Sequence, residues 1–275
     1  MNLRNLIKYG ALAHHRLFGH TPDNAVSILM YHRVTGDVPI ELDLPFDIFE
    51  QQMAWLADQG AVMPYAEAVD SLLQGHALPG LRYALTFDDA YADFYTHAWP
   101  VLRKYQLPAT LFVPTGFIDV PSCPPLSRDV PHADRLQPMT WEQLREVVAD
   151  PLMTLGTHTH NHPELSSLTS NEIAQEMETA ASRFTAELGF APKHFAYPRG
   201  RWNARAEHGV RPYCATAAIV GGVLARPENV GRYTVPRVPV RRGDGWNFFR
   251  ARATGALVGE ERLIAFAKGL RRAMH

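Results

Sequence analysis

The chain has 275 residues, of which 46% are apolar, and its 27 Lys and Arg against 28 Asp and Glu give a net charge of −1. This balance excludes the strong basic field with which proteins recruit nucleic acid, and no apolar run approaches the ~20 residues that a membrane-spanning helix needs. The two cysteines, Cys123 and Cys214, form no metal-ligand spacing and no disulfide framework, as expected in a reducing compartment.

Both ends of the chain have the pattern of an amphipathic helix. Residues 1–20 place apolar side chains on one helix face, broken by basic residues such as Arg4 and Lys8. They show neither the continuous apolar run nor the cleavage site of a signal peptide, which predicts a retained helix and a cytoplasmic protein. Residues 256–275 predict a second such helix, which leaves residues 21–255 for the main domain. The two helices could pack on that domain or on a second subunit, or rest with their basic faces on the inner face of the membrane.

Apolar runs and helical patterns alternate along the main domain. Helices are expected at residues 46–59, 65–73 and 91–105, and two more after the capping-box patterns that begin at Thr140 and Thr169. This alternation of strands and helices indicates βαβ units and a parallel sheet. A proline-rich stretch, residues 117–138, interrupts this alternation and predicts a long loop, which either borders the substrate groove or is an inert surface excursion. The strands are expected near residues 27, 61, 83, 109, 152, 194 and 215.

Two adjacent carboxylates, Asp88 and Asp89, follow a buried-strand pattern that begins at Tyr83. Neighbouring side chains on a strand point to opposite faces, so the two acids can share a site only where the strand ends and the backbone turns. Two like charges in a poorly solvated site repel each other, and a bound cation relieves that repulsion. The pair therefore predicts a cation site at the end of this strand.

Three histidines follow another strand pattern and supply further ligands: His158, His160 and His162. Imidazole suits zinc and its first-row neighbours, and a catalytic zinc commonly takes three protein ligands and keeps one position for water. An extended segment would put all three rings on one face, whereas one helical turn would group His158 with His162. Pro163 disfavours helical geometry at His162, so spacing leaves the pair open.

The two motifs together, Thr86-Phe87-Asp88-Asp89 and His158-Thr159-x-x-His162-Pro163, resemble those of the polysaccharide deacetylases, the NodB-homology enzymes of carbohydrate esterase family 4. The resemblance runs from about residue 27 to about residue 240 and implies an irregular (β/α)7 barrel, an incomplete relative of the TIM barrel. It also implies that Asp88 is the catalytic base and that Asp89, His158 and His162 bind the metal. Zinc is the expected ion, with cobalt or nickel as alternatives.

Three further residues are assigned through the same resemblance. Met30-Tyr31-His32 is similar to a segment of the circularly permuted biofilm-polysaccharide branch, which implies His32 as the general acid. Tyr197-Pro198-Arg199-Gly200 resembles the third family motif, and the backbone N–H of Arg199 is the expected donor to the oxyanion. The arginine that the family keeps in this motif is replaced by Ala196, and Arg237 is the expected substitute.

The predicted reaction is metal-assisted hydrolysis of an N-acetyl group on an amino sugar, with Asp88 taking a proton from an activated water. The expected substrate is an N-acetylated amino sugar, an oligosaccharide or a lipid-linked glycan. A related enzyme that removes a formyl group or opens another small amide is one alternative. A carbohydrate-binding pseudoenzyme is a second, since the third motif departs from the family pattern.

Overall fold

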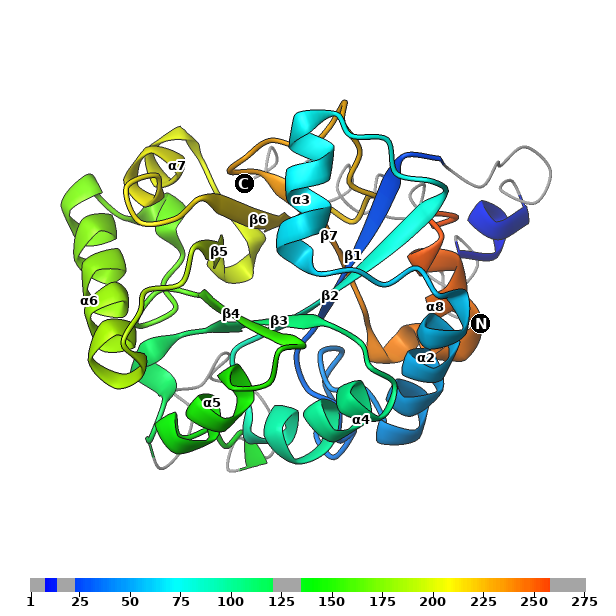
Figure 1. Ribbon diagram of the computed structural model, residues 1–275, viewed down its shortest axis with the longest axis horizontal. Coiled ribbons are helices and arrows are strands. Elements are labelled where there is room, and N and C mark those ends of the chain that lie inside the picture. Colours follow the sequence, from blue (N-terminus) through cyan, green and yellow to red (C-terminus); the bar gives the residue numbers. More distant parts are fainter. Residues whose placement is uncertain (1–7, 14–22, 121–134, 258–275) are drawn as a thin grey trace, which may run out of the picture.

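The computed structural model describes residues 8–13, 23–120 and 135–257. Its centre is a closed barrel in which seven strands pair in chain order and every neighbouring pair is parallel. Figure 1 shows the strands in the middle of the molecule with helices around them. The predicted seven-stranded α/β barrel is therefore confirmed. The strands are β1 (Ala25–Tyr31), β2 (Leu81–Asp88), β3 (Ala109–Val113), β4 (Met153–Thr157), β5 (His194–Ala196), β6 (Thr216–Val220) and β7 (Val235–Pro239).

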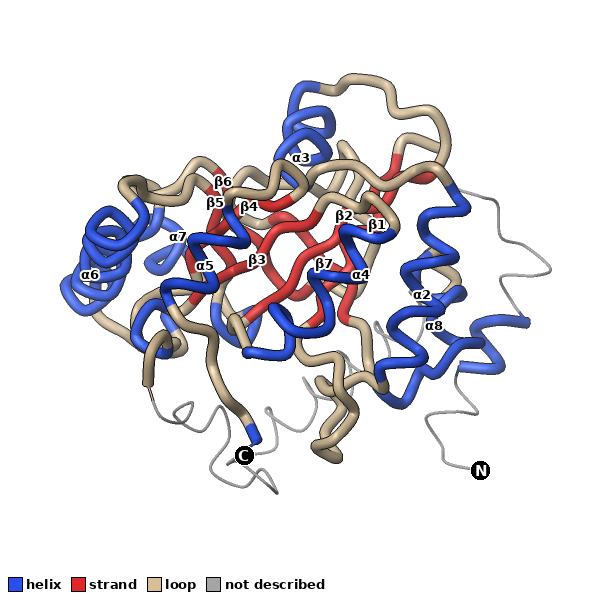
Figure 2. The backbone as a smooth tube through the Cα atoms, turned by 60° about the horizontal axis from the view of Figure 1, so that its bottom comes forward, coloured by secondary structure: helices blue, strands red, loops and turns tan. Residues whose placement is uncertain are grey.

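Helices connect the strands and cover the outside of the barrel (Figure 2). One of them, α3, instead packs against inward-facing side chains such as Val26 and Ala84, near the points where the strands begin. The α-helices are α2 (Phe46–Gln59), α3 (Tyr65–Gln74), α4 (Trp99–Lys104), α5 (Trp141–Val148), α6 (Ser170–Leu188), α7 (Ala204–Val210) and α8 (Gly245–Ala253). The short helices are η1 (Phe94–Ala98), η2 (Thr115–Phe117), η4 (Leu165–Ser167), η5 (Pro198–Gly200) and η6 (Arg242–Asp244).

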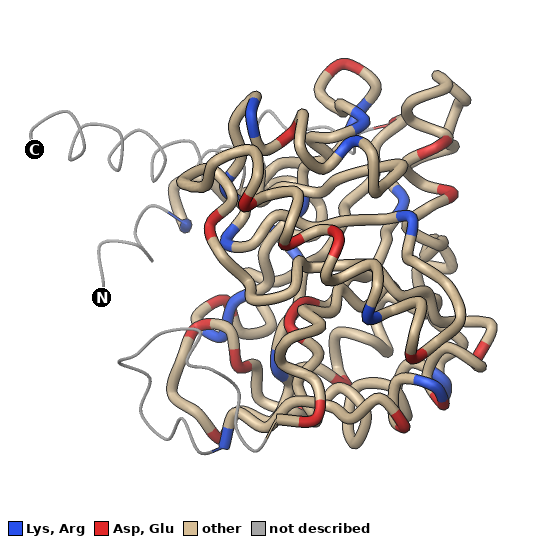
Figure 3. The backbone as a smooth tube through the Cα atoms, turned by 90° about the vertical axis from the view of Figure 1, so that its left-hand side faces the viewer, with Lys and Arg blue, Asp and Glu red and all other residues tan. Residues whose placement is uncertain are grey.

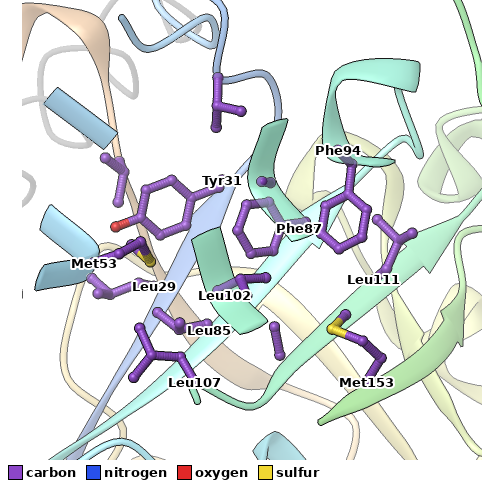
Figure 4. Packing of buried hydrophobic residues seen from close by; sticks show 14 of the residues in the cluster. Leu29, Tyr31, Met53, Leu85, Phe87, Phe94, Leu102, Leu107, Leu111 and Met153 are labelled. Carbon is purple, nitrogen blue, oxygen red and sulfur yellow. The ribbon is translucent and has the colours of Figure 1, made fainter. Parts of the chain in front are cut away.

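Side chains alternate between the two faces of each barrel strand, and this alternation determines which residues reach the interior. On β2, Leu85 and Phe87 point outward into the apolar layer beneath the helices, where Phe87 meets Tyr31 and Phe94 (Figure 4). Ala84 belongs to the inner cluster instead. Asp88 shares the inward side of the strand with Ala84, so the alternation places the first carboxylate inside the barrel.

One predicted strand was wrong, and one observed strand was not predicted. Residues 61–63 contribute only an isolated bridge between Val62 and Tyr83 and are not a barrel strand. The seventh strand is β7, which contains Pro236 and Pro239. Proline lacks an N–H to donate and usually argues against an interior strand, so the pattern of this segment was misleading.

The predicted helix boundaries agree closely with the structure. Gly60 and Gly189 end α2 and α6 in the left-handed conformation, and capping boxes at Thr140 and Thr169 begin α5 and α6. The helix expected over residues 91–105 is shorter and starts as the π-helical turn η1 before α4 continues it.

Only residues 8–13 of the predicted N-terminal helix lie within the described part, and they are helical. Lys8, expected on a basic face, is buried: its Nζ lies 2.8 Å from Asp244 Oδ1 and 4.7 Å from the Phe248 ring centre. The C-terminal helix prediction and most of the proline-rich loop fall outside the described residues. Among the described residues, no helix combines the length and apolarity needed to cross a bilayer. Acidic and basic residues are both spread over the described part of the molecule (Figure 3).

Candidate metal centre and active site

The two adjacent carboxylates meet at the point where β2 ends. Asp88 is the last residue of the strand, and Asp89 turns out of it with a φ of 75°. The amide of Asp89 still donates to the carbonyl of Phe112, 3.1 Å away, which holds this turn against β3. Both carboxylates are buried, with 3% of each residue exposed. The turn thus lets neighbouring side chains share one site, as the sequence pattern requires.

The structure selects two of the three histidines. The Nε2 atoms of His158 and His162 lie 3.1 Å apart, and Asp89 Oδ1 lies 3.6 and 3.4 Å from them respectively. His158 Nδ1 lies 2.7 Å from the carbonyl oxygen of Ala196, so it carries the proton and leaves Nε2 with a lone pair. His160 turns away and places its Nδ1 2.9 Å from Thr115 Oγ1.

The three grouped residues fit a divalent metal ion. Their donor atoms lie within 4.8 Å of one another, and Asp89 Oδ1 is buried without a hydrogen-bond partner. Burial lowers the pKa of both His158 and His162 to about 4, so both rings are neutral at pH 7, as a metal ligand must be. Burial raises the pKa of Asp89, with the charge of Asp88 adding to the effect, and a bound cation would offset that cost.

Asp88 forms a bidentate ion pair with Arg237 inside the barrel. Nη1 of the guanidinium lies 2.6 Å from Oδ1, and Nη2 lies 2.8 Å from Oδ2. The same guanidinium lies over the Phe112 ring and also donates to Thr86 Oγ1 at 3.3 Å. Burial raises the pKa of Asp88, but the charge and hydrogen bonds of Arg237, together with the charges of His158 and His32, outweigh burial, and the pKa lies well below its usual range. Asp88 is therefore ionised throughout the physiological pH range.

His32 follows β1 directly and lies close enough to both carboxylates for its charge to lower their pKa values. Its Nδ1 is buried and has no hydrogen-bond partner in the described part of the chain. The sequence left open which residue orients this ring, and no described side chain bonds to that nitrogen.

Arg199 lies in the turn η5 after β5, with a φ of 58°. Its charge acts on His162, so this turn lies beside the metal-ligand histidines. Gly200, the next residue, has a φ of 65°, and a Cβ there would lie 2.8 Å from the backbone nitrogen of Val220. The turn therefore requires glycine after Arg199, whereas position 199 holds a side chain although its backbone is also left-handed.

The sequence did not single out Thr86 and Phe112, which line the buried carboxylate–guanidinium pair. Both face inward on their strands: Thr86 lies two residues before Asp88 on β2, and Phe112 belongs to the inner cluster with Ala84. A period of two counted back from Asp88 would have identified Thr86. Nothing in the sequence marks Phe112 as a neighbour of the guanidinium.

A parallel barrel with buried carboxylates and histidines at the carboxyl ends of its strands defines a metal-dependent hydrolase of the α/β-barrel class. The family model described as polysaccharide deacetylase matches residues 77–214, and the chain belongs to this family. The resemblance inferred from the two motifs is thereby confirmed.

Relatives and solved structures agree with this assignment. The protein YxkH of Bacillus subtilis (strain 168), which carries the name of the same family, is 28% identical over 82% of this chain and 74% of its own length. The poly-β-1,6-N-acetyl-D-glucosamine N-deacetylase of Escherichia coli (strain K12) is 31% identical over 51% of this chain, but the match spans only 21% of that protein. The structure of IcaB from Ammonifex degensii has a TM-score of 0.72 at 25% identity, covering 84% of this chain and 98% of its own.

The Streptococcus pyogenes deacetylase PplD, solved in complex with acetate, shares the fold, with a TM-score of 0.69 at 23% identity. This similarity covers 84% of the present chain and 99% of PplD.

Proposed function

We propose that this protein removes the N-acetyl group from N-acetylglucosamine units of a glycan. The main support for the proposal is that the two sequence motifs meet in space. Asp89, His158 and His162 lie together at the strand ends, next to Asp88, which is paired with Arg237. The name of the E. coli relative supports N-acetylglucosamine as the sugar.

Asp89, His158 and His162 would hold the divalent ion. Zinc is the first candidate because two neutral imidazoles and one carboxylate make a donor set that it favours, and cobalt or nickel would also fit. When bound, the ion supplies the positive charge that polarises the acyl carbonyl and makes a water acidic enough to react near neutral pH.

Asp88 would take the proton from the attacking water. Arg237 favours the ionised form of this carboxylate and fixes its plane through one hydrogen bond to each oxygen. The strongly lowered pKa makes Asp88 a weak base, so it depends on the water being acidic. A carbon–oxygen bond then forms at the acyl carbon, and the backbone N–H of Arg199 donates to the oxyanion.

His32 would protonate the leaving nitrogen as the carbon–nitrogen bond breaks, which yields acetate and a free amino sugar. The proton that Asp88 accepts must leave the site before the next turnover. The charge of His32 acts on both Asp88 and Asp89, so the ring lies near the reacting groups, which supports this role.

The test is acetate release from N-acetylglucosamine oligosaccharides by protein loaded with zinc, cobalt or nickel, and by protein stripped with a chelator. The metal-loaded protein should release acetate and the stripped protein should not, with activity returning when metal is added. Formylated sugars serve as the competing substrate. A protein that binds metal and glycan but releases neither acyl group would refute the proposal.

A further inference from the structure

The loop that carries both metal-ligand histidines has an unfavourable backbone conformation. Thr159 and His162 have φ values of 68° and 56°, in the left-handed region where residues other than glycine are disfavoured. Such residues persist only where surrounding contacts hold them in place. Within the loop, the amide of His162 donates to Thr159 Oγ1 at 3.0 Å, which leaves most of the loop to be held from outside.

The carboxylate of Glu176, on α6, forms hydrogen bonds with the 158–162 loop. Glu176 Oε2 accepts the backbone N–H groups of His160 at 3.0 Å and Asn161 at 2.8 Å, and its Oε1 accepts the Asn161 side-chain amide at 2.8 Å. The helix itself is anchored in the core by Ile173 and Met177. Glu176 therefore projects from a rigid element and receives three hydrogen bonds from the two residues that precede His162.

The segment after β3 holds the same loop from another side. Thr115 Oγ1 bonds with the His160 ring at 2.9 Å, and the amide of Gly116 donates to the His160 carbonyl at 2.9 Å. A Cβ at Gly116 would lie 2.8 Å from that carbonyl oxygen, so even a methyl group would displace the loop. His160 is thus held through its N–H, its carbonyl and its ring, although it is the one histidine that does not face Asp89.

We propose that Glu176 is a positioning residue for the metal centre, which sets metal affinity by holding the 158–162 loop through the amides of His160 and Asn161. This inference rests on the proposed function, since it concerns the same ion. A carboxylate is suited to the task because a charged acceptor can hold several N–H donors at once. His160 and Gly116 complete the frame, so the middle histidine has a structural use distinct from that of its neighbours.

The test compares the metal dissociation constant of E176A with that of the wild type, by competition with a chromogenic chelator for zinc and cobalt. Removal of a group that orients a metal ligand typically weakens binding about 10–100-fold, and we expect E176A to fall in that range. Gln keeps one acceptor oxygen, so E176Q should bind metal with intermediate affinity. G116A, which pushes on the loop from the opposite side, should also weaken binding.

Glu178 provides the matched control. It lies on the same helix and accepts a side-chain hydrogen bond from Tyr213 at 2.9 Å, and among the described residues it forms no hydrogen bond with the 158–162 loop. E178A should bind metal as the wild type does. Metal-free E176A and E178A should unfold at similar urea concentrations, whereas hydrogen exchange at the His160 and Asn161 amides should accelerate only in E176A.

The outcomes separate the two proposals. If the wild type binds no metal, the proposed function fails. If the wild type binds metal and E176A binds it within about twofold of the same constant, the role of Glu176 is refuted while the proposed function stands; the ~10-fold lower limit defines that margin. Equal losses in E176A and E178A would also refute it, because the effect would then belong to the helix and not to the carboxylate.

Discussion

Replacement of Arg237 by Met should move the acid limb of the pH profile to higher pH. The guanidinium is fully buried and makes both short contacts to Asp88. His158 and His32 also lie close enough for their charges to act on this carboxylate. Met fills a similar volume beside Phe112 but leaves the buried carboxylate without its permanent counter-charge. The substitution therefore tests the ion pair with little change in the size of the side chain.

The magnitude follows from the two opposing influences on Asp88. Burial raises the pKa of this carboxyl and the charge of Arg237 lowers it, with a net pKa well below the usual range. A neighbouring opposite charge typically lowers a carboxyl pKa by about 1–3 units, and its loss in a buried site should return at least that amount. Without the guanidinium, burial would leave the pKa of Asp88 above its ordinary value of about 4. We therefore expect the pKa of Asp88 in R237M to rise by at least about 2 units, each worth about 1.4 kcal/mol, so that its acid limb in kcat/KM enters the assayed pH range.

Stability should change in the same experiment. Because the folded-state pKa of Asp88 is lowered, its contribution is fully present above the unfolded value of about 4 and is lost as the pH falls through the lower folded value. Removal of one partner of a buried pair typically costs about 3–5 kcal/mol, so R237M should be less stable at pH 7. R237K, which keeps a charge but cannot make both contacts, should show smaller changes in stability and in the profile.

The assay is acetate release from an N-acetylglucosamine oligosaccharide between pH 4 and 9 with saturating metal, since kcat/KM reports the groups of the free enzyme. Circular dichroism and urea unfolding would identify the pH range in which each variant is folded. A folded R237M with the wild-type acid limb would refute the view that Arg237 keeps Asp88 ionised.

Three other outcomes are expected. D88N should retain the metal and lose turnover, because an amide accepts no proton from water, which metal analysis and acetate release would show together. H162A should lose both metal and activity, whereas H160A should still bind metal measurably, since its ring bonds to a threonine and not to the site. Burial raises the pKa of Asp93 to about 6, so the folded state holds its proton more tightly than the unfolded state, and stability should fall as the pH rises from about 4 to about 6. D93N should flatten that slope in urea unfolding, and an unchanged slope would contradict the assignment.

The sequence predicted the barrel well because its strands are short apolar runs that differ clearly from the helical patterns between them. The strand β7 was not predicted, because it contains two prolines and a buried charge and has no alternation of apolar and polar residues. Inside the barrel Arg237 pairs with Asp88, and such a long-range contact leaves no local signal in the sequence. Residues 61–63 show the opposite case: their local pattern predicts a strand, but in the fold Val62 forms only an isolated bridge with Tyr83.

The grouping at the metal centre was partly predictable. Asp89 was expected near the histidines because both follow strand ends, and the family resemblance named His158 and His162 as its partners. Spacing alone left the choice between His160 and His162 open, because it does not reveal the left-handed backbone at Thr159. Glu176 was likewise hidden: on α6 it lies between two core residues and could have been an ordinary solvent-facing acid. Its contacts depend on how the helix docks, which is a property of the whole fold.

Arg237 on the last barrel strand, β7, is the counter-ion of Asp88 on the second strand, β2. Asp88 and Arg237 are 149 positions apart, and they meet only when β7 has joined β1 and β6. A polypeptide that ends before β7 would still contain Asp89, His158 and His162, but it would lack Arg237 and could not pair Asp88 with its counter-ion. Acetate release would therefore indicate that the barrel has closed, and a fragment that lacks β7 should be inactive.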